Sequence, residues 1–277
     1  MANTIFKLEK QKISISGKEG DLILTRIVAN ETFYEIQMLN YIKRLGLTGC
    51  AIDAGAHVGN HTIFLAKFCN FDKVLAFEPN PESLNYLRQN ISENALTRIV
   101  GINGYGLASN SAEMHMTIPQ EANSGGARIS EHGDFAVQVK RLDDVVHDEA
   151  ISLIKIDVEG YEIELLLGAL VTIQKSRPHI FIEAQSSERL NEISEVLAPA
   201  SYSIGPKFNS TPTYHFYPKE WTYELLDVID DLSVRNLDLM TSYSWRLTSP
   251  LRTFTRLVRR FNQGVKKMWR GLKWARK

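Results

Sequence analysis

The stretch from Cys50 to Pro79, CAIDAGAHVGNHTIFLAKFCNFDKVLAFEP, decides the fold of this chain. It begins with a short apolar strand over residues 50–54 and continues through a glycine turn into an apolar helix over 60–68. A second strand over 74–77 follows, and Glu78 closes it. An open α/β sheet builds a nucleotide pocket in this order, at the carboxyl ends of its strands. The stretch therefore predicts such a pocket.

The turn carries Asp53, Gly55 and Gly59 in the spacing D-x-G-x-x-x-G. Glycine lets a backbone approach a ligand closely, because no Cβ stands in the way. Glu78 lies about twenty residues beyond the turn, where a carboxylate can accept hydrogen bonds from both hydroxyls of a ribose. We therefore expect the pocket to bind an adenosine.

The acid in the turn bears on which adenosine ligand is bound. The dinucleotide fingerprint G-x-G-x-x-G has a glycine where this chain has Asp53. A carboxylate there would repel a pyrophosphate, but it suits a ligand that carries an ammonium and a sulfonium. The turn thus favours S-adenosylmethionine as cofactor. A NAD-dependent oxidoreductase on the same sheet remains an alternative.

Patterns in the rest of the chain predict strands that alternate with helices, which is typical of a doubly wound parallel sheet. The predicted strands lie at 98–102 (ending at Asn103-Gly104), 114–118, 135–142, 151–156, 179–183, 201–205 and 213–217, and the helices at 31–45, 161–174 and 187–197, with Pro81 opening another. A hairpin is expected over 12–29 around a Gly17–Gly20 turn. The Gly-, Ser- and Asn-rich loop over 121–133 is expected to be either a mobile lid or an ordinary surface connection. The expected fold class is α/β, Rossmann-like and mostly parallel with an antiparallel edge.

The chain is expected to divide into four parts. Residues 1–48 form the N-terminal hairpin and helix, 49–220 the ligand-binding core, 221–248 a connecting helical segment and 249–277 a basic amphipathic tail. Residues 251–277 hold ten Lys or Arg and no Asp or Glu, although the net charge of the chain is zero. So sharp a division of charge indicates a separate role for the tail.

The tail pattern predicts a helix that starts at Ser249-Pro250, with an apolar stripe and cationic flanks. Such a helix suits an anionic membrane surface. A partner protein or a second copy of the chain is the alternative, which leaves a homo-oligomer open. Nucleic acid is the least favoured partner, because no base-reading module is recognised. No signal segment or membrane span is evident, so the expected location is cytoplasmic, peripheral at the inner membrane face.

Three segments resemble the FkbM-type methyltransferases. They are Asp53–Gly59 (DAGAHVG), Phe77–Pro81 (FEPNP) and Leu153–Glu162 (LIKIDVEGYE), with smaller matches at Glu31–Glu35, Leu142–Asp144, Gly125-Gly126 and Phe181–Glu183. The resemblance covers roughly residues 20 to 200, and DVEGYE is its most specific segment. His57 stands where members of that family often carry Asn.

The resemblance implies a class I methyltransferase fold, S-adenosylmethionine as methyl donor, and O-methylation of a sugar, glycan or glycolipid-type acceptor. A small natural-product hydroxyl is the alternative acceptor, and a non-catalytic membrane-associated adaptor the alternative function. The expected donor-binding residues are Asp53, Gly55, Ala56, His57, Val58, Gly59, Asn60, Thr62, Glu78, Pro79, Asn103, Gly104 and Asp157.

Methyl transfer to a hydroxyl also requires that the hydroxyl lose a proton, through a general base or a metal ion. Acids at the carboxyl ends of the strands are the candidates, because ligands of open α/β sheets bind there. Asp157, Glu159, Glu183 and His57 are the expected catalytic residues, with Asp157 nearest the donor in the family pattern. Three carboxylates could also hold Mg²⁺, but a metal is not favoured, since carboxylates at loop starts are common. His61 is a further base candidate, although a packing or capping role is favoured for it.

Overall fold

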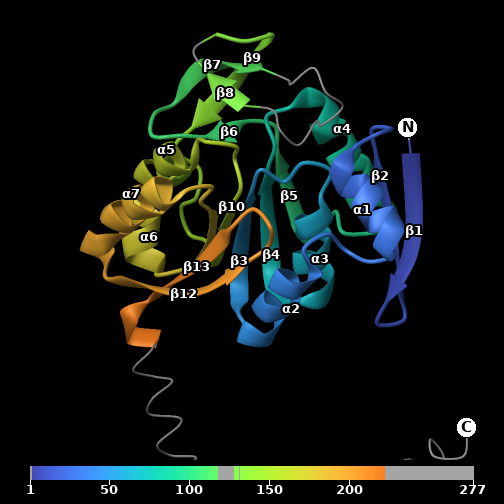
Figure 1. The fold of residues 1–277 in the computed structure, drawn as a ribbon, viewed down its shortest axis with the longest axis horizontal. Helices are drawn as coiled ribbons and strands as arrows, with labels where there is room; N and C mark the ends of the chain where they lie inside the picture. The colour runs from blue at the N-terminus through green and yellow to red at the C-terminus, as the bar shows by residue number, and fades with distance from the viewer. Residues whose placement is uncertain (1, 118–127, 131, 222–277) are drawn as a thin grey trace, which may run out of the picture. The chain divides into compact units, whose positions relative to one another are not determined.

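The computed structural model describes residues 2–117, 128–130 and 132–221 (Figure 1). Its strands are β1 (Ala2–Leu8), β2 (Gln11–Gly17), β3 (Thr48–Ala54), β4 (Asn70–Phe77), β5 (Val100–Asn103), β6 (Gly106–Leu107), β7 (Ala112–Thr117), β8 (Arg128–Ser130), β9 (Phe135–Lys140), β10 (Ile151–Ile156), β11 (His179–Glu183), β12 (Tyr202–Phe208) and β13 (Thr213–Pro218). Its helices are α1 (Leu22–Asn30), α2 (Ile36–Leu45), α3 (Asn60–Phe68), α4 (Pro81–Glu93), α5 (Glu162–Leu167), α6 (Leu170–Ser176) and α7 (Ser187–Leu197), with short 3₁₀ turns at Leu142–Asp144 and Ala198–Ala200.

The central sheet has seven strands in the order β12-β13-β11-β10-β3-β4-β5. The chain adds β4 and β5 in parallel on one side of β3, then returns to add β10 and β11 in parallel on the other side. β13 and β12 complete the sheet as an antiparallel edge. The expected doubly wound, mostly parallel sheet is confirmed. Its topological switch point lies between β3 and β10, where ligands of such sheets bind.

Helices cover both faces of this sheet, with α3 and α4 on one side and α5, α6 and α7 on the other (Figure 1). Strand residues alternate between the two layers. Ala51 of β3 packs in the core with Ile63 of α3, whereas its neighbour Ile52 packs in the core with Ile173 and Ile193 of α6 and α7. Because apolar side chains fill both layers, polar residues that end the strands are left at the sheet's carboxyl edge.

A second sheet, in the order β6-β9-β7-β8, stands over one end of the central sheet (Figure 1). The expected strand pair around residues 114–118 and 135–142 is confirmed as the antiparallel pair of β7 and β9. Most of the loop over residues 121–133, interpreted as a lid or a surface connection, lies outside the described residues.

The hairpin expected over residues 12–29 is wrong. The hairpin is formed by β1 and β2, whose two-residue turn places Glu9 and Lys10 at positive φ. Residues 22–30 form helix α1, because the Asp21 carboxylate accepts a hydrogen bond from the Leu24 amide at 2.9 Å and caps the helix. The alternating polar and apolar pattern of this segment is therefore outweighed by an N-cap.

Two predicted helices differ from the structure at identifiable residues. The helix expected over 161–174 is divided into α5 and α6 around Gly168, where a Cβ would lie 2.0 Å from the Ala108 carbonyl oxygen. The helix expected over 31–45 begins only at Ile36, because Glu35 has a left-handed backbone with φ 59°. In contrast, the bounds predicted for α3, β10, β11 and α7 are confirmed residue for residue.

Residues 222–248 of the predicted connecting segment 221–248, and the whole of the predicted amphipathic tail 249–277, lie outside the described residues. Within the described part of the chain, none of the helices has the length and apolar character needed to span a membrane.

Candidate active site

A pocket of about 280 Å³ opens at the carboxyl ends of β3, β4, β10 and β11, beside the switch point. Its wall includes the glycine turn, the residues that end the strands, and part of α1 with the segment that follows it. Of the expected site residues, the pocket is lined by Gly55, Ala56, His57, Asn60, Glu78, Pro79, Asp157, Glu159 and Glu183. The topology thus brings together side chains from four separate parts of the sequence.

The glycine turn is held against the end of β4 by backbone hydrogen bonds. The amides of Gly55 and Ala56 both donate to the carbonyl oxygen of Phe77 at 3.0 Å. Gly55 has φ 77°, and a Cβ there would lie 1.8 Å from the Asp157 carbonyl oxygen, so no other residue fits. This close packing of the turn on two strand ends fixes the floor of the pocket.

Glu78 is buried at the same point and is oriented by two backbone amides. Its Oε2 accepts from His57 at 2.7 Å and its Oε1 accepts from Asn80 at 2.8 Å. Burial raises the pKa of this carboxyl, although the nearby His57 acts to lower it. Each carboxylate oxygen has a second lone pair, so Glu78 can still accept hydrogen bonds from a pair of ligand hydroxyls.

Asp53 differs from the electrostatic expectation. Its side chain is 0% exposed and does not line the pocket. Its Oδ2 accepts from the Thr62 hydroxyl at 2.5 Å, and its Oδ1 lies 3.4 Å from Nζ of Lys155. Lys155 stands directly opposite Asp53 in the register of β10 on β3. The charge of Asp53 is therefore balanced inside the protein and is not presented to a ligand.

Lys155 connects this buried pair to the pocket. Its ammonium also lies 3.5 Å from Oδ2 of Asp157 and donates to the Gly55 carbonyl oxygen at 3.2 Å. Burial acts to lower the pKa of Lys155, but the two aspartates outweigh it and the pKa is raised. The ammonium thus remains charged and holds the glycine turn and both aspartates in place.

Asp157 and Glu183 form a carboxyl pair at the ends of β10 and β11. Burial acts to raise the pKa of Asp157, but the charges of Lys155 and His61 outweigh it and the pKa is lowered. For Glu183, burial and the adjacent Asp157 raise the pKa to about 9. Near neutral pH the pair therefore carries one proton, held on Glu183.

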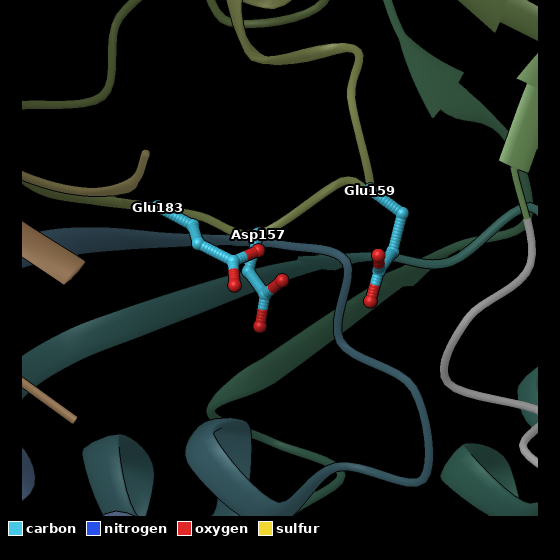
Figure 2. A group of neighbouring side chains, drawn as sticks. All are labelled: Asp157, Glu159 and Glu183. Atoms are coloured by element: carbon cyan, nitrogen blue, oxygen red, sulfur yellow. The ribbon is translucent and has the colours of Figure 1, made fainter. Parts of the chain in front are cut away.

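Glu159 completes a group of three carboxylates. Figure 2 shows Asp157 and Glu183 side by side and Glu159 reaching toward them from the loop that follows β10. One oxygen of each lies within 4.8 Å of the others. Glu159 has φ 51°, and Gly160 follows with φ 102°. This left-handed pair turns the loop so that Glu159 lies on the pocket wall.

The two histidines of the turn have acidic partners. Nε2 of His57 lies 3.3 Å from Oδ2 of Asp21 at the start of α1, and Nε2 of His61 lies 3.1 Å from Oε2 of Glu35. His61 and Glu35 both line the pocket. The segment that carries Glu35 is held by Asn60, whose side chain accepts from the Tyr34 amide and donates to its carbonyl oxygen.

The remaining expected donor-binding residues lie outside the pocket wall: Asp53, Val58, Gly59, Thr62, Asn103 and Gly104. The Asn103 side chain donates to the Ala76 carbonyl oxygen at 3.3 Å and accepts from the Tyr105 hydroxyl at 3.2 Å. Thr62 is engaged with Asp53. A role in donor binding stays a prediction for these six residues.

Four further residues of the pocket wall have no role predicted from the sequence: Lys155, Glu35, Tyr34 and Arg26. A lysine inside the apolar strand segment ISLIKI was a usable signal for Lys155, because a buried ammonium requires an anionic partner. No comparable signal exists for Tyr34 and Arg26. They reach the pocket only because α1 and the following segment fold back over the sheet's edge.

Comparison with known proteins agrees with this geometry. The family model of the methyltransferase FkbM domain matches residues 53–204, which is more than half of the chain. The chain belongs to the FkbM methyltransferase family. The match begins at Asp53 in the glycine turn and extends past Glu183, so the FkbM domain contains the three carboxylates as well as Glu78.

Two curated relatives of this FkbM chain are methyltransferases. The chain is 27% identical over 154 residues to hexuronic acid methyltransferase AglP of Haloferax volcanii, covering 54% of this chain and 62% of that protein. It is 30% identical over 152 residues to methyltransferase sdnD of Sordaria araneosa, covering 42% and 59%. The chain spans about three fifths of the length of these relatives.

A solved structure has the same fold. It is the crystal structure of methyltransferase FkbM from Methylobacillus flagellatus, with a TM-score of 0.52 and 22% identity over 68% of this chain and 49% of that one. The class I, Rossmann-like methyltransferase fold expected for the FkbM chain is therefore confirmed.

Proposed function

We propose that this protein is an S-adenosylmethionine-dependent O-methyltransferase that acts on a hydroxyl of a carbohydrate acceptor. Membership of the FkbM family supports methyl transfer. The arrangement of the glycine turn beside Glu78 is the observation that favours S-adenosylmethionine as the donor. Gly55 and Ala56 of the turn line the pocket beside Glu78, and Glu78 is held by two amides with lone pairs available for ribose hydroxyls.

The charge of the pocket supports a cationic donor, although not through Asp53. Five carboxylates line the described wall, against the two permanent cations Arg26 and Lys155. Even with Glu183 protonated, acids outnumber these cations. Such a surface attracts a sulfonium and an ammonium and repels a pyrophosphate. The same observation disfavours the NAD-dependent oxidoreductase.

The proposed reaction is an in-line displacement. The bond between the donor's sulfur and its methyl carbon breaks as a bond from the acceptor oxygen to that carbon forms, and S-adenosylhomocysteine leaves as a neutral thioether. The hydroxyl proton passes to a carboxylate of the site, for which Glu159 is the better candidate. Glu183 already carries a proton near neutral pH, because its pKa is raised to about 9 by burial and by Asp157.

A sugar is the proposed acceptor because one relative acts on a hexuronic acid by name. The pocket supports a polar acceptor: beside the carboxylates it is lined by Ser210, Thr211 and Thr213, whose hydroxyls can exchange hydrogen bonds with a sugar. A natural-product hydroxyl is the second acceptor class, supported by the resemblance of the chain to the FkbM methyltransferases as a whole.

The test compares turnover with donor binding. Glu159→Gln keeps the shape of the site but removes the proton acceptor, so we expect a loss of turnover of about 10²-fold or more with donor affinity unchanged. Glu195→Gln, an exposed glutamate on α7, is the matched control. Turnover is followed as a gain of about 14 Da (one added CH₂) in glycans that are incubated with the enzyme and donor. Full turnover by Glu159→Gln would move the proton acceptor to another residue.

We also propose that residues 249–277 hold the enzyme at an anionic membrane surface, where a lipid-linked glycan would be accessible. The support is the run of ten Lys or Arg without an acid in residues 251–277. Flotation with anionic liposomes compares the full chain with a chain that ends at Ser249. Equal flotation of the two proteins would refute the membrane role and leave a partner protein as the tail's ligand.

A further inference from the structure

Asp157, Glu159 and Glu183 form a set of oxygen ligands that two neighbouring parallel strands bring to one point. Asp157 and Glu159 follow β10 and Glu183 ends β11, and one oxygen of each lies within 4.8 Å of the other two. Ligand oxygens on opposite sides of a cation lie twice the bond length apart, about 4.2 Å for Mg²⁺ and about 4.8 Å for Ca²⁺, and neighbouring ligand oxygens lie closer. With 4.8 Å as the upper limit of their separation, rotation of the side chains would bring all three oxygens to the coordination distance of a hard divalent cation.

A group of acids does not by itself define a cation site, but Glu183 adds an independent observation. Its side chain is only 8% exposed, and its Oε2 accepts no hydrogen bond from a donor among the described residues, although the Glu183 carboxyl lies within hydrogen-bond reach of Asp157. Figure 2 shows this carboxyl directed toward Asp157, on the side from which Glu159 approaches. A buried carboxylate oxygen without a partner is costly unless a ligand satisfies it.

The buried lysine does not occupy this position. Nζ of Lys155 is engaged with Oδ1 of Asp53 at 3.4 Å and with the Gly55 carbonyl oxygen at 3.2 Å, and it reaches only Asp157 of the three acids. Its charge balances that of Asp53. With Glu183 protonated, the group still carries two negative charges at short distance, and a divalent cation that displaces this proton would offset the repulsion among all three carboxylates.

We infer that these three carboxylates bind one divalent cation of the Mg²⁺, Mn²⁺ or Ca²⁺ class, and that the cation holds the acceptor. The inference rests on the proposed function and deepens it. Three protein oxygens leave about three of six coordination positions for water or for acceptor oxygens. A sugar with neighbouring hydroxyls, or with a hydroxyl beside a carboxylate, can fill two of them.

In this arrangement the cation polarises the acceptor hydroxyl. Each carboxylate contributes one oxygen. The hydroxyl proton passes to Glu159, and the methyl group and electron pair follow the same course as in the proposed reaction. The cation adds a contact to the acceptor and leaves donor binding by Glu78 and the glycine turn unchanged.

The test measures binding of Mn²⁺ to the full chain after treatment with EDTA and gel filtration, by electron paramagnetic resonance, with Mg²⁺ and Ca²⁺ as competitors. The expected result is one Mn²⁺ per chain, with affinity lowered at least 10-fold in Glu183→Gln and in Glu159→Gln. Glu195→Gln, which is exposed and does not line the pocket, should bind as the wild type does. Circular dichroism checks the fold of each variant. If Glu183→Gln does not fold, the Mn²⁺ affinity of Glu159→Gln decides the test.

Absence of Mn²⁺ binding at millimolar concentration, or equal affinity in wild type and both variants, would overturn the inference. Binding of S-adenosylmethionine is measured separately in EDTA by calorimetry. If the donor binds while Mn²⁺ does not, the cation site fails and the proposed function stands. If Mn²⁺ binds at the cluster while the donor does not, the proposed function fails and the cation site stands by itself.

Discussion

Replacing Lys155 with methionine isolates the electrostatic role of the buried ammonium. Methionine keeps a long, flexible apolar stem but removes the charge. Lys155 is 4% exposed and its partner Asp53 is 0% exposed, so water cannot replace the lost ammonium at Asp53. The Thr62 hydroxyl remains as a neutral donor to the other oxygen of Asp53. Asp157 is 38% exposed, so water can solvate its carboxylate in part when the ammonium is lost.

The expected cost follows from the burial of the pair. Removing one partner of a buried ion pair costs about 3–5 kcal/mol, because the other charge is left uncompensated. For a protein of about this size, 1 kcal/mol corresponds to a shift in Tm of about 2–4 °C. Lys155→Met should therefore lower Tm by about 6–20 °C.

Urea unfolding followed by circular dichroism measures this free energy. Lys7→Met, an exposed lysine of β1, is the matched control and should change stability by less than about 0.5 kcal/mol. The double variant Asp53→Asn, Lys155→Met removes the stranded charge and should be more stable than Lys155→Met alone. Additive single and double effects, within about 0.5 kcal/mol, would refute the pairing of Asp53 with Lys155.

Two further predictions concern the pocket. Gly55→Ala should abolish donor binding in calorimetry and lower Tm, because its Cβ would meet the Asp157 carbonyl oxygen. The control Gly46→Ala, at a glycine with positive φ but open space around it, should lower the free energy of unfolding by only about 1 kcal/mol. Equal losses of stability in the two variants would contradict the steric argument. The pKa of Glu183 is raised to about 9 in the folded protein, so the folded state holds a proton that the unfolded state releases above about pH 4.5. The free energy of unfolding of wild type should therefore fall as pH rises from about 4.5 toward 9, and in EDTA Glu183→Gln should lose less stability than wild type over that interval. Parallel curves of unfolding free energy against pH would exclude a proton held on Glu183.

Much of the fold could be predicted from local sequence. The segments with continuous apolar runs or strong helical spacing, such as 151–156 and 60–68, have the predicted bounds. The predicted secondary structure is wrong where a single residue outweighs the hydrophobic pattern of its segment. Asp21 caps a helix inside a segment that alternates like a strand, and Gly168 divides a helix because the Ala108 carbonyl oxygen passes too close for a Cβ.

The sequence predicts which carboxylates meet at the candidate site, but not how their charges are paired. Asp157, Glu159 and Glu183 follow predicted parallel strands, so their meeting at one edge follows from topology alone. The pairing of Asp53 with Lys155 depends on the register between β3 and β10, which the sequence does not reveal. Similarly, Glu35 reaches His61 only through the folding of α1 and the following segment over the sheet.

Calorimetric titration with S-adenosylmethionine and with NAD, on wild type and on Glu78→Gln, determines which adenosine ligand the pocket binds and whether Glu78 holds it. We predict one S-adenosylmethionine bound per chain and no heat of binding from NAD. The affinity for S-adenosylmethionine should be at least 10-fold weaker in Glu78→Gln, which loses a charged acceptor for the ribose hydroxyls. Binding of NAD in place of S-adenosylmethionine, or equal binding of S-adenosylmethionine by wild type and Glu78→Gln, would contradict it.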